Sequence, residues 1–184
     1  MPGVNLEREV KLSFDSVEQA REAVLAAGAT PLRARRLQED ALLDTADGCL
    51  RERRCVLRIR TEGAKSRVAF KGPTQPSPFK TREEIETVVG DSATLLQLFA
   101  ELGFTPSFRY QKYREEFARE DVIVAIDETP VGVFVEIEGS AGGIDAMAAA
   151  LGRGPDDYII QSYRTLFLAS EDGREARDML FEEA

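Results

Sequence analysis

The 184-residue sequence predicts an α+β fold with enough strands to close a β-barrel. About eight runs of alternating or β-branched residues follow one another, mostly across short turns, and such consecutive strands pair antiparallel. Three segments with apolar residues at helical spacing lie between them. At least six strands carry one apolar face and one fully charged face. We therefore expect the helices to cover the apolar faces from outside, with the charged faces turned into a closed barrel.

The first half of the chain is predicted to form five strands and one helix. The first strand covers residues 6–14, and residues 15–18 have the form of a helix start capped by Asp15, with Gly28 as the stop. A strand over 32–43 leads into a turn cluster at 44–48. The remaining strands of this half cover residues 55–61, 67–71 and 81–89.

The second half is predicted to form three strands between two helices, followed by a helical tail. Asp91 caps the first of these helices, and apolar residues at helical spacing over 144–151 mark the other. The tail from Ser162 is predicted to be helical, with an interruption near Gly173. The three strands cover residues 107–117, 122–127 and 131–138.

The amino-acid composition limits which catalytic groups, metal sites and partners the chain can have. There is no histidine, so Ser-His and Cys-His nucleophiles and His-ligated metals are excluded, and a general base must be a carboxylate, a perturbed Lys or Tyr, or metal-bound water. The net charge of −9 argues against nucleic-acid and anionic-membrane partners. No segment approaches a membrane span or a secretory signal. We expect a cytoplasmic protein with one domain over residues 1–184, in which Cys49 and Cys55 are reduced thiols.

The charged strand faces bring two kinds of side chain together. Two Glu-x-Glu pairs, Glu7 with Glu9 and Glu136 with Glu138, offer clustered carboxylate oxygens, which suit Mg²⁺ or Mn²⁺. Arginines and lysines on neighbouring strands offer contacts to phosphate oxygens. Together they indicate a site for a metal-chelated polyphosphate. A solvated sheet face with Glu–Arg pairs also explains any single strand, so the prediction depends on the whole set.

Several short motifs follow one another in an order that a known family shares. They are Glu7-Arg8-Glu9-Val10-Lys11, Asp44-Thr45, Leu57-Arg58-Ile59-Arg60, Lys71-Gly72-Pro73, Arg82-Glu83-Glu84-Ile85-Glu86, Lys112-Tyr113-Arg114, Ala125-Ile126-Asp127 with the strand from Gly132 to Glu138, and Ser162-Tyr163. By these motifs the chain resembles the CYTH, or triphosphate tunnel metalloenzyme, superfamily over nearly its whole length. The chain length and the Ser-Tyr tail are compatible with its class IV adenylate cyclase and thiamine triphosphatase-like branch.

The resemblance implies an eight-stranded antiparallel tunnel that binds a triphosphate with a divalent metal, Mg²⁺ or Mn²⁺. The implied metal ligands are Glu7, Glu9, Glu136 and Glu138, with Asp127 as an addition. The implied phosphate-binding residues are Lys11, Arg58, Arg60, Lys71, Arg82, Lys112 and Arg114, and the implied catalytic residues are Glu7, Glu9 and Lys11. Glu84 and Glu86 either complete the metal's surroundings, orient basic partners, or belong to a salt-bridged wall. Asp44 and Thr45 are expected to shape a turn rather than to touch substrate.

The resemblance leaves the reaction open between hydrolysis and cyclisation, because one tunnel serves both. We rank a triphosphatase acting on tripolyphosphate or on a nucleoside or thiamine triphosphate first, because hydrolysis asks least of the site. The alternative is an adenylate cyclase that converts ATP to cyclic AMP and pyrophosphate. A non-catalytic polyphosphate- or nucleotide-binding module and a purely structural barrel are further alternatives. The expected partner is a small triphosphate-containing molecule, and the oligomeric state, monomer or homodimer, stays open.

Overall fold

The computed structural model describes residues 5–171, 173 and 178–182, and this part of the chain contains eight strands and five α-helices. The strands are β1 (Asn5–Phe14), β2 (Thr30–Asp44), β3 (Val56–Glu62), β4 (Lys65–Lys71), β5 (Lys80–Val89), β6 (Thr105–Arg119), β7 (Val122–Thr129) and β8 (Gly132–Gly139). The helices are α1 (Val17–Ala26), α2 (Cys49–Glu52), α3 (Ser92–Glu101), α4 (Ala141–Ala150) and α5 (Tyr163–Ala169), with a 3₁₀ turn, η1 (Pro155–Asp157). Each predicted strand is present, whereas α2 lies between the predicted turn at 44–48 and the predicted strand at 55–61, where no element was predicted.

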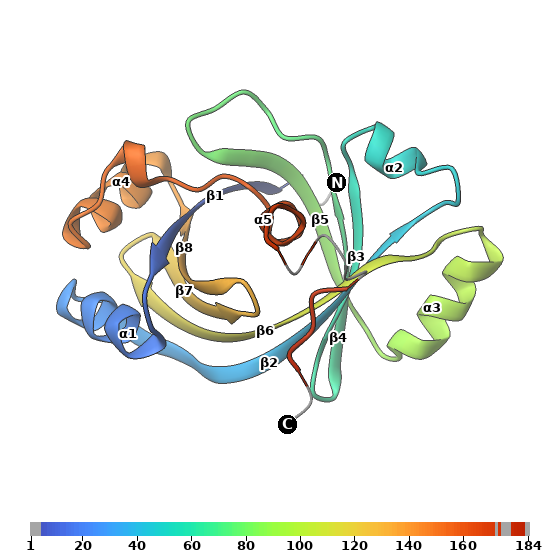
Figure 1. Cartoon of the computed structure of the whole chain (residues 1–184), viewed down its shortest axis with the longest axis horizontal. Coiled ribbons are helices and arrows are strands. Elements are labelled where there is room, and N and C mark those ends of the chain that lie inside the picture. The colour runs from blue at the N-terminus through green and yellow to red at the C-terminus, as the bar shows by residue number, and fades with distance from the viewer. Residues whose placement is uncertain (1–4, 172, 174–177, 183–184) are drawn as a thin grey trace.

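The eight strands close into one antiparallel barrel, which confirms the predicted fold class. The order around the barrel is β1-β5-β4-β3-β2-β6-β7-β8, and β8 returns to β1. Figure 1 looks along the barrel and shows the strands as a ring. Because β1 lies between β5 and β8, residues from the start, middle and end of the chain meet on one wall.

Two strands are much longer than predicted. β2 and β6 each have 15 residues, and they pair along most of their length. Three register shifts interrupt this pairing, and such irregularities bend a strand and increase its twist. The long β2–β6 pair can therefore curve around the barrel and bring inward-facing residues from β2 into the tunnel.

α1 and α4 cover one side of the barrel, as predicted. They lie together outside β1, β7 and β8 in Figure 1. Their buried apolar residues, such as Val24 and Ile144, join a core with Val10, Phe117 and Ile137 from the strands. Ser16, and not Asp15, caps α1, because its hydroxyl accepts from the backbone N–H of Gln19 at 3.1 Å.

α3 does not cover the barrel, and here the prediction that all three helices shield apolar strand faces is wrong. It contains no buried residue, and Leu98 and, just beyond the helix, Leu102 are 52% and 63% exposed. The helix stands out at the side of the ring in Figure 1. Its apolar spacing predicted the helix correctly, but spacing does not say what a helix packs against.

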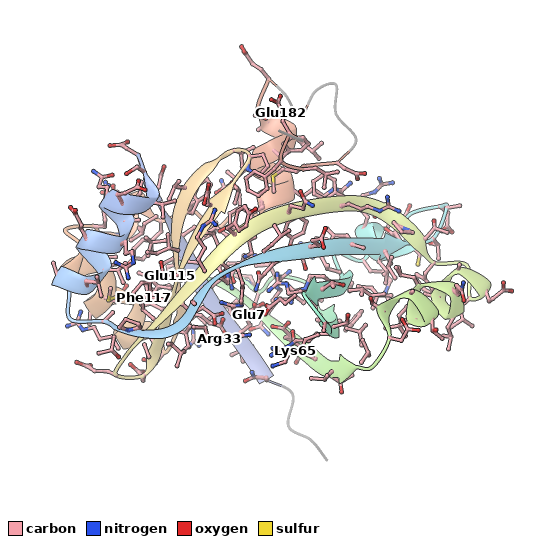
Figure 2. All side chains as sticks on the ribbon, turned by 90° about the horizontal axis from the view of Figure 1, so that it is seen from below. Glu7, Arg33, Lys65, Glu115, Phe117 and Glu182 are labelled. Atoms are coloured by element: carbon pink, nitrogen blue, oxygen red, sulfur yellow. The ribbon has the colours of Figure 1, made fainter. Side chains whose placement is uncertain are left out.

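α5 sits at one end of the barrel. Figure 1 shows it end-on within the ring, and Figure 2 shows it at the side opposite to Glu7, Arg33 and Lys65. A backbone bridge between Lys11 and Ile159 precedes the helix, and a bridge between Tyr110 and Met179 follows it. The apolar side of α5 packs on β6 and β8 in a separate core of Phe108, Tyr110, Phe134, Tyr163, Phe167 and Met179. None of the described helices has the length and apolar content needed to cross a membrane.

Candidate functional site

The interior of the barrel is a charged cavity of about 680 Å³. It extends from a rim that includes Arg33, Arg67 and Glu116 to the side chains of α5 at the other end. Eleven basic and eight acidic side chains line it, so the lining is net positive although the whole chain carries −9. The predicted inward orientation of the charged faces is confirmed. A lining of this kind suits an anionic ligand accompanied by a cation.

Four carboxylates line the wall formed by β1 and β8, although in the described residues no three acidic or thiol side chains are placed so that they could hold a metal ion as they stand. Glu7 and Glu9 come from β1 and Glu136 and Glu138 from β8, and the register places Glu9 directly opposite Glu138. Glu138 forms no ion pair within the described part of the chain. Burial is the largest cause, and repulsion from the other three carboxylates adds to it, so the pKa of Glu138 rises to about 7.

Lysines and arginines stand next to this acidic wall. Lys71 Nζ lies 2.6 Å from Glu7, and Arg82 Nε lies 3.0 Å from the other oxygen of the same carboxylate. Lys11 and Lys80 both contact Glu9 Oε1, at 2.9 and 2.6 Å. Burial acts to raise the pKa of Glu9, and these two lysines more than offset it, so the carboxylate stays ionised.

A second set of cations is anchored by Asp127 on β7. Arg114 binds this carboxylate through Nε and Nη2, at 2.6 and 2.5 Å, and Lys112 Nζ lies 2.8 Å away. The Tyr163 hydroxyl donates to the same carboxylate at 2.6 Å. Asp127 is fully buried and does not line the cavity. Both of its oxygens accept hydrogen bonds, so in this structure Asp127 anchors Lys112 and Arg114, and its role as a metal ligand stays a prediction.

The remaining predicted residues form the wall from β3 to β5. Arg60 binds Asp40 through two hydrogen bonds, at 2.9 and 3.0 Å. Arg58 lies between Asp40 and Glu86, at 3.6 and 3.4 Å. Glu84 contacts Lys71 at 3.1 Å and Glu86 contacts Arg67 at 2.9 Å. These ion pairs fit two of the alternatives for Glu84 and Glu86, orientation of basic partners and a salt-bridged wall.

Asp44 and Thr45 lie outside the cavity lining, in agreement with the predicted turn. The Asp44 carboxylate accepts from the backbone N–H groups of Thr45, Leu50 and Arg51, at 2.9 to 3.1 Å. These bonds cap the first turn of α2 and hold the pKa of Asp44 below its usual range against the effect of burial. The Asp-Thr pair therefore builds the connection between β2 and β3.

Four side chains of the site were not identified from the sequence: Gln38, Asp40, Lys80 and Tyr163. Lys80 precedes Arg82 by two residues, so extending the alternation of β5 backwards would have found it. Gln38 and Asp40 also lie two apart, but the mixed composition of β2 concealed its inward face. For Tyr163 the sequence offered the family motif and no chemical signal.

The ring of Tyr163 separates two of the lysines. Lys11 Nζ and Lys112 Nζ each lie 5.0 Å from its centre, within the range of a cation–π contact. Burial and the neighbouring Arg114 lower the pKa of Lys112 to about 7. The cavity therefore contains a lysine and a glutamate that both titrate near neutral pH, in a chain without histidine.

Comparisons with known proteins agree with this geometry. The model of the CYTH domain matches residues 5–153. A protein of Methanocaldococcus jannaschii, whose name proposes an adenylate cyclase, is 31% identical over 172 residues, which cover 88% of this chain and 98% of that protein. The solved PH1819 protein of Pyrococcus horikoshii has 26% identity and a TM-score of 0.73, over 88% of this chain and 98% of that one. A solved adenylyl cyclase homologue of Hippeastrum, described as having a dominant triphosphatase activity, has 19% identity and a TM-score of 0.60, over 91% and 93%.

Proposed function

The chain belongs to the CYTH domain family, and from this membership we propose that it is a divalent-metal-dependent triphosphatase that acts inside its barrel. The proposed substrates are tripolyphosphate and nucleoside or thiamine triphosphates. One observation carries the proposal: a single cavity joins the four-carboxylate wall of β1 and β8 to basic side chains from the other strands.

The acidic wall is the proposed metal site. Glu7, Glu9, Glu136 and Glu138 would hold Mg²⁺ or Mn²⁺, because both ions prefer carboxylate and water oxygens. A bound cation would neutralise charge on the phosphate oxygens and make a bound water more acidic. The raised pKa of Glu138 supports this assignment, since a cation on the wall would relieve the repulsion that raises it.

The basic side chains would bind and orient the triphosphate. Their fixed positions matter because phosphoryl transfer depends on in-line placement and charge stabilisation more than on covalent chemistry. Asp127 and Asp40 hold their arginines in place before the substrate arrives, which lowers the cost of ordering them. The proposed phosphate-binding residues are Lys11, Arg58, Arg60, Lys71, Arg82, Lys112 and Arg114, and we add Lys80 to the proposal because it lines the same cavity.

Lys11 connects the two halves of the proposed site. Its ammonium group lies 2.9 Å from Glu9 and 3.2 Å from Glu136, so it orients one carboxylate from each Glu-x-Glu pair. Lys112 can hold or release a proton at Nζ near neutral pH, because its pKa is about 7. The proposed hydrolysis therefore has both a fixed cation beside the metal wall and a titratable group, Lys112, on β6.

Cyclisation of ATP is the second candidate, because the M. jannaschii relative carries the name of an adenylate cyclase. Product analysis separates the two. The purified protein is incubated with Mg²⁺ or Mn²⁺ and, separately, with tripolyphosphate, ATP and thiamine triphosphate. Release of orthophosphate from tripolyphosphate supports the triphosphatase assignment. If cyclic AMP and pyrophosphate are the main products from ATP, the protein is an adenylate cyclase instead.

Two substitutions test the role of the carboxylate wall in the same assay. Glu9→Gln and Glu136→Gln should each lower turnover by about 100-fold or more, because metal ligation requires the charged oxygens. Glu22→Gln, on the exposed face of α1, is the matched control and should leave turnover unchanged. Wild-type turnover in either cavity variant would contradict the metal assignment.

A further inference from the structure

Gln38 is a neutral side chain in a cavity otherwise rich in charge. It lies on β2, is only 1% exposed, and is opposite Lys112 in the β2–β6 pairing. Burial of an amide is unfavourable unless its donors and its acceptor all find partners. The amide nitrogen of Gln38 has a partner, whereas its carbonyl oxygen has none within the described residues.

The orientation of the amide is set by Glu62. Gln38 Nε2 donates to Glu62 Oε1 at 2.5 Å. Burial acts to raise the pKa of Glu62, but hydrogen bonds and charge from Arg36 outweigh it, so the carboxylate is ionised and can only accept. The amide nitrogen must therefore face Glu62. The carbonyl oxygen, Oε1, has no hydrogen-bond partner within the described residues.

The groups around Gln38 limit which donor can form a hydrogen bond with this carbonyl oxygen. Lys112 donates one N–H to Asp127, and Arg36 Nε donates to Glu62 at 2.9 Å. Arg36 Nη2 lies 2.9 Å from Glu116 without a hydrogen bond, and neither Arg36 nor Lys112 donates to Gln38 Oε1. A phosphate oxygen is itself an acceptor and cannot serve. Because Gln38 is almost fully buried, the missing partner must be both a hydrogen-bond donor and small. An O–H group in the cavity meets both requirements.

We propose that Gln38 is a positioning residue whose carbonyl oxygen binds an O–H group in the active cavity. This inference rests on the proposed function. The O–H group comes either from a water held beside the triphosphate or from a hydroxyl of an organic triphosphate. Tripolyphosphate lacks carbon-bound hydroxyls and ATP has them on its ribose, so the two substrates distinguish the sources.

The test compares Gln38→Met with Gln111→Met. Methionine keeps the length and removes the polar atoms. Gln111 lies on the same pair of strands and donates to Glu39 at 3.0 Å, but on the outside of the barrel. We expect kcat/KM to fall about tenfold in Gln38→Met, the usual value of one neutral hydrogen bond, and to stay unchanged in Gln111→Met. A loss with both substrates identifies a bound water, and a loss with ATP alone identifies a substrate hydroxyl.

A second pair of variants keeps Gln38 in place, in case Gln38→Met does not fold. In Glu62→Gln the side-chain amide of Gln38 can rotate by half a turn, because the amide introduced at position 62 can donate as well as accept. Glu116→Gln is its control, since Glu116 binds the same arginines, Arg33 and Arg36, without contacting Gln38. Glu62→Gln should lower kcat/KM at least threefold more than Glu116→Gln does.

Values within twofold of the wild type for both Gln38→Met and Glu62→Gln, with both substrates, would overturn the inference. Absence of wild-type turnover would instead refute the proposed function. In that event the dissociation constants of tripolyphosphate and ATP with Mg²⁺, measured by calorimetry on the same variants, decide the role of Gln38 by the same criteria.

Discussion

Lys112 and Glu138 face the same cavity, and both have a pKa of about 7, with burial as the largest cause of each shift, downward for Lys112 and upward for Glu138. Arg114 lowers the first further, and neighbouring carboxylates raise the second further. Lys112 and Glu138 can therefore exchange protons near neutral pH, a role that histidine often has and that no histidine can fill in this chain.

The pKa of Glu138 has a measurable effect on stability. The carboxyl titrates at 4.5 when unperturbed and at about 7 in the fold, so its ionisation opposes folding. This penalty is absent below the unperturbed pKa and complete above the folded pKa. Glu138→Gln should therefore raise the unfolding midpoint of the metal-free protein by several degrees at about pH 8 and leave it unchanged near pH 4. An equal change at both pH values would contradict the repulsion described for the acidic wall.

Asp127 provides the second test at this scale, because the sequence suggested a metal ligand and the structure indicates an anchor. Asp127→Asn removes the carboxylate paired with Lys112 and leaves Arg114 with Glu136 alone, and breaking a buried ion pair in this way typically costs about 3–5 kcal/mol. Thermal unfolding should show this loss, while Asp145→Asn on the surface of α4 should not. A variant with wild-type stability and weakened Mg²⁺ binding would favour the metal-ligand role instead.

α5 closes one end of the barrel and also places Tyr163 beside Lys11 and Lys112. Phe167 anchors it, with its ring 6.0 Å from that of Phe108. Phe167→Ala should destabilise the protein by about 3–5 kcal/mol, as is usual for a buried aromatic residue. Leu168→Ala, at the neighbouring and half-exposed position, should cost less than about 1 kcal/mol. Equal midpoints for the two variants in thermal unfolding would show that α5 does not depend on this core.

The elements also show what could be predicted from the sequence. Alternation in β1, β3, β5 and β8 revealed their inward charges, because each charged residue there is two positions from the next. β2 has register shifts and a mixed composition, so neither its inward face nor Gln38 was found. The exposure of α3 and the packing of α5 depend on distant contacts that local spacing does not encode.

At the scale of the whole molecule, the distribution of charge matters more than its sum. The chain carries −9, yet the cavity lining has more basic than acidic groups. The excess of acids therefore lies elsewhere on the protein, where it argues against nucleic-acid partners, while the barrel concentrates positive charge around a small volume. Barrel closure is what makes this separation possible, since it turns the charged face of each strand to one interior.

The most direct test of this account is a calorimetric titration of tripolyphosphate into the protein in the presence of Mg²⁺. The wild type should bind one tripolyphosphate per chain. Lys71→Gln, at the buried end of β4, should weaken binding by about tenfold or more, because it removes a charged contact from inside the cavity. Lys65→Gln, at the exposed start of the same strand, should bind like the wild type. Absence of binding to the wild type, or equal weakening by both substitutions, would contradict a triphosphate site inside the barrel.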